Sequence, residues 1–389
     1  MTLPNVSAAN LNLIVDRIVG HAEAQATAAE EVPANCLAEL GLVLMARHQD
    51  PYAPAVGRGR DAAIRTLNAE DANGNFFGGT VGAAWLLTQF AAHAPSATAA
   101  AALAEFDQVL FESVADVTIA SPPPIGLWDG VAGWLTYALA RRHDALLDML
   151  CDLLARLAVA GEQRGTRYWA EYQPSSGRAV EVGLGHGAGA LLVGLAQLST
   201  RVPARADAET LLADATRWLL GRIRPGGHSC FGWFEYEGES QSLIKTDAGW
   251  AHGDAGVGLA LYAAATALGD RAWQAQAIEV ALRSTQRPMA DYIQEPNVTI
   301  SHGAAGLLHI YHQLYRATGR DEFALAAGRW LSWCIDQYSA AAPELPPPPA
   351  KGWGFSFVGG HLGVAAVLIS LTQAEPPPWT DYIATTMNR

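Results

Sequence analysis

The chain has 389 residues and a formal net charge of −13, with 50% hydrophobic and 16% charged residues. An acidic surface repels phosphate backbones, so this composition argues against nucleic-acid binding, and no apolar run is long enough to span a membrane. The four cysteines form no C-x-x-C pair and the N-terminus lacks the order of a secretory signal, so we expect a cytoplasmic protein with reduced thiols.

Residues 1–75 form the first predicted segment. Leu11, Ile14 and Ile18 recur at helical spacing, so the segment is expected to contain helices. It lacks the glycine phrases that mark the rest of the chain. We therefore expect it to pack outside a ring formed by residues 76–389, and we expect the whole chain to be one structural domain.

Residues 76–389 contain six short glycine phrases, each opening an alanine-rich apolar stretch that is typical of a helix. They are Gly79-Thr-Val-Gly82, Gly130-Val-Ala-Gly133, Gly187-Ala-Gly-Ala190, Gly253-Asp-Ala-Gly256, Gly303-Ala-Ala-Gly306 and Gly360-His-Leu-Gly363. Their first glycines lie 51, 57, 66, 50 and 57 residues apart, which is room for two helices and their loops. Six helix pairs that close into a ring leave no pair with an uncovered apolar face. The sequence thus predicts an all-α fold, an (α/α)6 toroid whose inner helices start at the phrases.

An aromatic loop, Phe231-Gly-Trp-Phe-Glu-Tyr-Glu-Gly238, lies between the third and fourth phrases. Trp233 in this loop is a candidate to grip a peptide at the mouth of the ring. The alternative is that these aromatic rings plug one end of the barrel. Glu235 and Glu237 could form the carboxylate pair of a glycosidase, a class that also uses six-pair toroids. However, two carboxylates that alternate within one short segment do not make two walls of a cleft.

Histidine immediately precedes the third, fourth and fifth phrases, at His186, His252 and His302. If the ring closes, these side chains lie at the same end of neighbouring inner helices. Imidazole has an ordinary pKa that suits proton transfer near neutral pH. The pattern therefore predicts a functional cluster at one mouth of the ring. The alternative is that each histidine caps its own loop through backbone hydrogen bonds.

Two aspartates flank the middle histidine. Asp247 is a candidate to orient the imidazole of His252. Asp254 could do the same, or could cap the helix that begins near Gly253, and capping is the favoured interpretation.

The phrases Gly183-Leu-Gly-His-Gly187, Trp250-Ala-His-Gly-Asp-Ala-Gly256 and Ser301-His-Gly-Ala-Ala-Gly306 resemble those of the lanthionine synthetase C-like cyclases. The resemblance covers residues 76–375 and keeps the family's order and spacing. It implies an (α/α)6 toroid that adds a cysteine thiol to dehydroalanine or dehydrobutyrine within a dehydrated precursor peptide, forming a thioether ring. A dehydratase or a decarboxylase is a candidate partner, although the sequence does not tell whether one docks on the acidic surface.

The resemblance implies a zinc site that this chain does not keep. The two zinc-binding cysteines of the family correspond to Ala251 and Ser301, and the histidine ligand is retained as His302. A catalytic zinc needs about three protein ligands, so we predict a protein without zinc or any other cofactor; a zinc ion held by the three histidines is the alternative. The family's aspartate before the second phrase is Gly126 here, with Asp129 nearby, and its arginine before the lost cysteine is Asp247.

Cyclisation without metal is chemically reasonable. The cysteine thiol has a reference pKa of about 8.5, and a histidine base is typically worth about 10²- to 10⁴-fold in rate. In this interpretation His302 or His252 takes the thiol proton and His186 protonates the α-carbon, and the residues leave the assignment open. The alternative is a non-catalytic member that binds precursor peptide or a partner modifying enzyme.

The predicted site residues fall into two groups. We assign catalysis to His186, His252, His302 and Asp247, and substrate binding to Trp250, Asp254, Trp233 and Asp129, with no metal ligand.

Overall fold

The computed structural model of the protein describes residues 7–387 apart from short internal stretches. Those stretches are residues 29–31, 49, 51–52, 71, 162, 164, 174–176, 202–205, 237–245, 247, 288–296, 341–344, 347–353 and 375.

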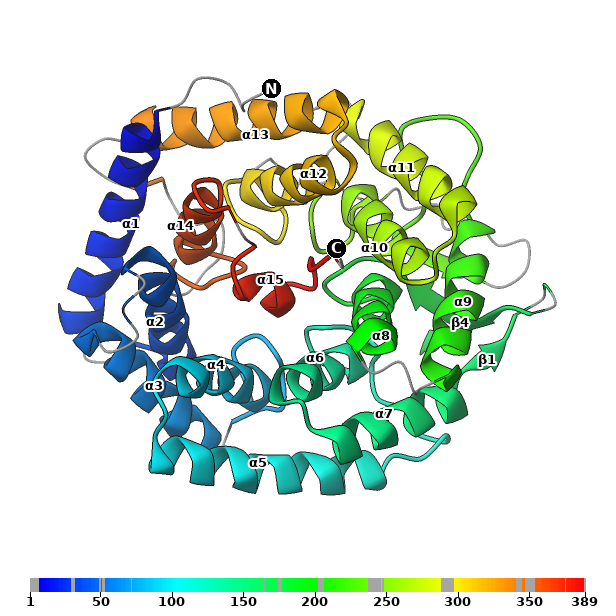
Figure 1. Ribbon diagram of the computed structural model, residues 1–389, viewed down its shortest axis with the longest axis horizontal. Coiled ribbons are helices and arrows are strands. Elements are labelled where there is room, and N and C mark those ends of the chain that lie inside the picture. Colours follow the sequence, from blue (N-terminus) through cyan, green and yellow to red (C-terminus); the bar gives the residue numbers. More distant parts are fainter. Residues whose placement is uncertain are drawn as a thin grey trace.

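Two concentric layers of helices surround a common axis (Figure 1). The inner layer holds α2 (Ala34–His48), α4 (Thr80–His93), α6 (Val131–Arg141), α8 (Ala188–Arg201), α10 (Asp254–Ala267), α12 (Ala304–Thr318) and α14 (His361–Ser370). The outer layer holds α1 (Ala8–Ala28), α3 (Pro54–Leu67), α5 (Ala97–Ala115), α7 (Asp144–Leu157), α9 (Ala206–Leu220), α11 (Arg271–Thr285) and α13 (Asp321–Ala340). Every residue of α14 is buried, as expected for a helix enclosed on all sides. The predicted all-α toroid is confirmed.

The N-terminal segment differs from expectation at one helix. α2 contacts α14 on one side and α4 on the other, so it closes the inner layer, while α1 lies outside α14. The described inner layer therefore has seven helices, six of them started by glycine phrases. Close packing fixes α2 against α3, because a Cβ on Gly59 would lie only 2.9 Å from the Cα of Gly41. No glycine phrase precedes α2, which is why its place in the ring could not be foreseen.

The glycine phrases are needed for close approach of the backbone. Gly79, Gly130, Gly253, Gly303 and Gly360 are the N-caps of their helices and are extended. The second glycine of a phrase then packs on the loop that enters the helix. A Cβ at Gly82 would lie 1.6 Å from the carbonyl oxygen of Phe76, so no larger residue fits without moving the loop.

Backbone hydrogen bonds join the six entry loops side to side. The donors and acceptors follow one another around the ring: Phe76 N to Trp128 O (2.7 Å), Trp128 N to Gly185 O (2.9 Å), Gly185 N to Ala251 O (3.0 Å), Ala251 N to Ser301 O (2.9 Å) and Ser301 N to Val358 O (2.9 Å). This belt satisfies backbone groups that the tight loops would otherwise bury unpaired. It also fixes the relative positions of whatever side chains the loops carry.

The ring closes through a buried carboxylate on α2. Glu39 Oε2 accepts a hydrogen bond from Phe357 N at 2.9 Å, and its Oε1 accepts one from the Tyr382 hydroxyl at 3.0 Å. We call Glu39, Phe357 and Tyr382 the closure seam. Burial raises the pKa of Glu39 to about 7, although both hydrogen bonds act in the opposite direction.

The C-terminal segment occupies the centre of the ring (Figure 1). It comprises the short helix α15 (Trp379–Tyr382) and the residues after it. Trp250 Nε1 donates to the carbonyl of Ile383 at 2.8 Å, and His309 Nε2 lies 2.8 Å from Thr385 Oγ1. The Tyr382 ring lies 4.9–5.4 Å from four aromatic rings of the inner wall, which belong to Phe76, Phe77, Trp85 and Phe357.

Two small antiparallel sheets are added to the helices, and the sequence did not predict them. One pairs β1 (Val159–Ala160) with β2 (Arg167–Tyr168). The other has the order β3-β4-β5, formed by Glu171–Gln173, Gly177–Glu181 and Phe234–Tyr236. The second sheet matters for the site, because it brings the aromatic loop beside the loop that enters α8. Within the part of the chain that is described, no helix has the length and apolar character to cross a membrane.

Candidate active site

Four rings form a row at the end of the toroid where the inner helices begin. The ring centroids of Trp128 and His186 lie 5.4 Å apart, those of His186 and His252 lie 5.6 Å apart, and those of His252 and His302 lie 5.5 Å apart. We call these four side chains the imidazole arc. The three histidines come from the loops that enter α8, α10 and α12, which the backbone belt holds together. The structure thus gathers the three histidines that the sequence singled out.

Exposure differs along the arc. His252 in the middle is 6% exposed, whereas His186 and His302 on either side are partly exposed. Burial lowers the pKa of His186; the charges of Glu181 and Asp129 oppose that effect, and those of His252 and His302 add to it. The uncharged form of His186 is therefore favoured at neutral pH.

Glu181, the last residue of β4, supplies a carboxylate to the arc. Its Oε1 lies 2.7 Å from His252 Nδ1 and accepts a hydrogen bond from Trp233 Nε1 at 3.0 Å. The contact with His252 has the distance of an ion pair, but the ring N–H is not aligned for a hydrogen bond. We regard it as a charge contact, which gains strength when the imidazole takes a proton.

Trp233 covers the middle of the arc. Its ring centroid lies 4.3 Å from that of His252. The pairing of Glu181 with Phe234 across β4 and β5 places it there. Asp254 fixes the start of the same loop, because its carboxylate accepts the backbone N–H groups of Cys230 at 2.9 Å and Phe231 at 3.2 Å. The loop is therefore held from two sides.

Two of the predicted substrate-binding residues are fully buried. Trp250 and Asp254 are both 0% exposed. The indole N–H of Trp250 is bonded to the C-terminal segment, and Asp254 is occupied by the aromatic loop. In the structure both side chains are therefore shielded from solvent and engaged by other segments of the chain. Asp129 is exposed and Trp233 is partly exposed, as a binding role requires. Asp247 lies outside the described residues.

Only Glu235 of the carboxylate pair in the glycosidase interpretation lies among the described residues. Glu235 is buried and its Oε1 accepts hydrogen bonds from Gly232 N at 2.6 Å and Arg224 Nη2 at 3.0 Å. It therefore anchors the loop rather than facing a cleft. Glu237 lies outside the described residues.

Gly126, where the family pattern places an aspartate, has no space for a side chain. A Cβ there would lie 2.5 Å from both the Cα and the carbonyl oxygen of His186. The close approach that holds His186 in the arc therefore excludes a carboxylate at this position. Asp129, three residues later, is exposed at the start of α6.

The three zinc-ligand positions of the family come together in space, but their side chains do not fit the metal. Ala251 N donates to Ser301 O at 2.9 Å, and His302 follows directly. Alanine has no ligating atom, and the Ser301 hydroxyl lies 3.4 Å from the hydroxyl of Thr299. One imidazole and a neutral hydroxyl fall short of a zinc donor set. Across the described residues, no group of three or more His, Cys, Asp or Glu side chains is arranged to hold a metal ion.

The protein's own thiols are not candidates for this chemistry. All four cysteines lie within the described part of the chain, are buried, and take part in no disulfide. Burial raises the pKa of Cys230 and of Cys334 to about 12, so neither provides a thiolate nucleophile near neutral pH.

Sequence reasoning missed Glu181 and Trp128. Glu181 stands five residues before His186, and Trp128 two residues before Gly130. Their positions next to glycine phrases were the available signal. The contact of Glu181 with His252 arises from the pairing of β4 with β5 and from the neighbouring loops of the belt, so it could not be deduced from spacing.

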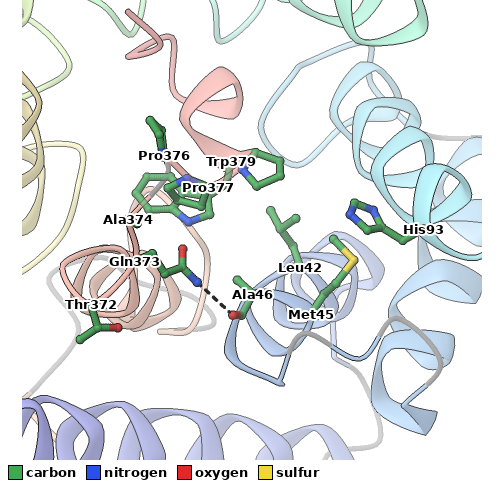
Figure 2. A pocket seen from close by; sticks show the side chains of 11 residues that line it. Leu42, Met45, Ala46, His93, Thr372, Gln373, Ala374, Pro376, Pro377 and Trp379 are labelled. Carbon is green, nitrogen blue, oxygen red and sulfur yellow. Dashed lines mark hydrogen bonds between the residues drawn. The ribbon is translucent and has the colours of Figure 1, made fainter. Parts of the chain in front are cut away.

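Cavities also occur at the opposite end of the ring. Figure 2 shows one of about 510 Å³ between the end of α2, the end of α4 and the segment after α14, with Met45, His93 and Trp379 in its lining. Gln373 closes one side by donating to the carbonyl of Ala46 at 3.3 Å. Because the inner helices end here and the histidines lie where they begin, this cavity is separate from the arc.

Comparison with known proteins identifies the family. A family model described as lanthionine synthetase C-like protein matches residues 54–383. The chain belongs to this family. Among solved structures, nisin cyclase matches with a TM-score of 0.72 at 15% sequence identity, covering 97% of this chain and 98% of that chain. At this identity the likeness shows a shared fold.

Two carbohydrate-active proteins match this lanthionine synthetase C-like chain less well. A glycosyl hydrolase of family 88 from Bacteroides vulgatus has a TM-score of 0.42 at 12% identity, covering 94% of this chain and 98% of that chain. A polysaccharide lyase has a TM-score of 0.41 at 12% identity, covering 87% and 100%. Scores this low support no argument about activity.

Proposed function

We propose that the protein is a lanthionine-type peptide cyclase that adds a cysteine thiol to dehydroalanine or dehydrobutyrine without zinc. The observation that carries the proposal is the imidazole arc, with Glu181 beside its middle ring. Membership of the lanthionine synthetase C-like family supports the reaction class. The substrate is a dehydrated precursor peptide, and a dehydratase or a decarboxylase is the proposed partner.

His252 is the proposed base. Its Nδ1 faces Glu181, so the other ring nitrogen is the one that receives the thiol proton. The positive charge that then forms on the ring is stabilised by the carboxylate 2.7 Å away. The thiolate adds to the β-carbon of the dehydroamino acid, and the electrons of the carbon–carbon double bond move to the α-carbon and its carbonyl.

His186 is the proposed acid that completes the addition. Because its pKa is lowered, the protonated form is the minor one near pH 7, but it gives up its proton to carbon readily. The proton that His186 supplies is restored from solvent, which also accepts the proton held by His252, so the cycle balances. α8, α10 and α12 each begin two residues after one of the three histidines, and the positive ends of these helices favour the transient negative charge of the enolate.

The energetic demand on the arc is modest. A thiol with a pKa of about 8.5 is about 3% ionised at pH 7, a penalty of roughly 2 kcal/mol. General-base catalysis typically supplies about 10²- to 10⁴-fold in rate, or roughly 3–5 kcal/mol. Holding both reacting groups of one peptide in the ring adds an orientation effect.

The test is a thiol count on a dehydrated cysteine-containing peptide. The purified protein is stripped of metal with a chelator and incubated with the peptide, which is then alkylated and analysed by mass spectrometry. Loss of alkylated thiols above a no-protein control supports the cyclase. Because the four protein cysteines are buried, only peptide species need to be scored.

The second candidate is a member that binds peptide without turnover. The absence of a ligating atom at Ala251 and of any room for a carboxylate at Gly126 favours it. It predicts an unchanged thiol count together with measurable association of the same peptide. Substitution of His252 would then leave the association unaltered.

A further inference from the structure

A groove opens at the same end of the toroid as the imidazole arc. It lies between the end of α3, the loop that enters α4, the C-terminal half of α5 and the start of α6, and its volume is about 520 Å³. In Figure 1 these four elements are consecutive along one side of the ring, with α5 outside α4 and α6.

The groove has an apolar floor and an acidic rim. Phe106, Val109 and Trp134 supply apolar surface, and Val109 is 53% exposed. Glu105 and Asp129 supply two exposed carboxylates. The described lining contains no lysine or arginine to neutralise them. An exposed apolar surface with charge of one sign at its edge is typical of a site that receives a complementary partner.

Asp129 connects the groove to the arc. It precedes the first glycine of the second phrase, just as His186 precedes that of the third. The neighbouring Trp128 stacks on His186 with 5.4 Å between the ring centroids. The charge of Asp129 also acts on His186, since it works to raise the pKa of that imidazole. A chain lying in the groove therefore leads directly to the first histidine.

We propose that this groove binds the stretch of the substrate peptide that flanks the reacting residues, and that it selects apolar side chains alternating with lysine or arginine. The identity of the bound peptide as substrate rests on the proposed function. Charge complementarity decides the occupant: a basic segment meets Glu105 and Asp129, whereas a second copy of this chain, with a net charge of −13, would bring like charges together.

The first experiment measures binding alone, so it does not depend on turnover. A fluorescent peptide of alternating leucine and lysine is titrated with the wild-type protein at low salt by anisotropy. Matched peptides replace lysine by glutamate or leucine by serine. We expect the leucine–lysine peptide to bind most tightly, and we expect salt to weaken it because exposed charges are screened.

Matched variants locate the binding surface. Glu105→Lys is expected to weaken the leucine–lysine peptide about fivefold, which is the scale of an exposed charge pair, and to improve binding of the leucine–glutamate peptide. Asp152→Lys makes the same charge change at an exposed position of α7 outside the groove and should leave affinity unchanged. Val109→Ser should weaken binding, whereas Leu325→Ser on α13, where the leucine is 63% exposed, should not.

The outcomes separate the groove from the catalytic proposal. The groove assignment is overturned if Glu105→Lys and Asp152→Lys have the same affinity as each other for each of the three peptides, or if the wild-type protein binds none of them. This holds even where the thiol count shows cyclisation. If binding follows the charges but no thiol is lost, the groove stands and the catalytic proposal fails. Concentration-dependent dimerisation that Val109→Ser abolishes would show the groove to be a contact between copies and would overturn the proposal.

Discussion

The imidazole arc and the closure seam are built from similar chemical groups but have different roles. In each, a buried carboxylate accepts a hydrogen bond from an aromatic side chain: Glu181 from Trp233 at 3.0 Å and Glu39 from Tyr382 at 3.0 Å. In the seam the second oxygen meets the backbone N–H of Phe357, a donor that does not titrate. In the arc the neighbour is an imidazole, 2.7 Å away. A carboxylate among neutral donors can only hold structure together, whereas one beside an imidazole can support proton transfer.

Burial reinforces this contrast. Both glutamates are shielded from water, but the seam lies within the packed centre of the ring, whereas the arc has a partly exposed histidine on either side of His252. Of the two sites, only the arc has titratable side chains that are partly open to solvent. Changes to the arc should therefore alter chemistry with little effect on folding, and changes to the seam should do the reverse.

The largest expected effect comes from rebuilding the family's zinc ligands next to the arc. Ala251→Cys combined with Ser301→Cys would place two thiolates beside His302, since the two loops are already joined by a 2.9 Å backbone hydrogen bond. We expect the double variant to bind one zinc ion with micromolar or tighter affinity, roughly 8 kcal/mol. Elemental analysis after dialysis measures it, with Ala251→Ser as the control. A double variant that retains no zinc would show that the loops are spaced wrongly for the metal.

The next effect is loss of the proposed base. His252→Ala should lower the cyclisation rate by about 10²- to 10⁴-fold, the usual worth of a general base, without changing peptide affinity. His309→Gln is the matched control, because His309 is buried against the C-terminal segment and has a pKa lowered to about 3. It should reduce stability and leave the rate intact. Equal rates for His252→Ala and the wild type would assign the reaction elsewhere.

The closure seam should make the free energy of unfolding depend on pH. The folded state keeps the proton of Glu39 up to pH about 7, whereas the unfolded chain releases it near 4.5, so this group's stabilising contribution is full below 4.5 and is lost as pH rises through 7. Glu39→Gln removes that loss, which is on the order of 3 kcal/mol. Urea unfolding at pH 5 and pH 8 measures it. Because His309 and His361 stay in both proteins, their opposite pH dependence cancels in the comparison. The same pH slope in variant and wild type would contradict the assignment.

The smallest effect concerns the positioning carboxylate of the arc. Glu181→Gln keeps the hydrogen bond from Trp233 but removes the charge beside His252. We expect the rate to fall about 10- to 100-fold while the free energy of unfolding changes little. The dependence of the cyclisation rate on pH is the second readout, since a purely structural role would not alter it. An unchanged rate and profile would remove Glu181 from the mechanism.

The sequence by itself determined the ring and the meeting of the three histidines. Both follow from the glycine phrases. A backbone approach as close as that of Gly82 to Phe76 requires glycine, so it can be recognised in the sequence. A glycine phrase that recurs in each repeat indicates an equivalent position in space. His186, His252 and His302 occupy this position in three consecutive repeats.

Only the tertiary structure decided which neighbours those histidines meet and how the ring closes. Glu181 reaches His252 through strand pairing and the belt, α2 completes the inner layer without a glycine phrase, and Trp250 is enclosed by a segment more than a hundred residues away in sequence. Such contacts depend on which distant surfaces pack together and leave no periodic signal in the chain. The sequence could therefore name the candidate side chains, while packing determined which of them are partly exposed and which are buried.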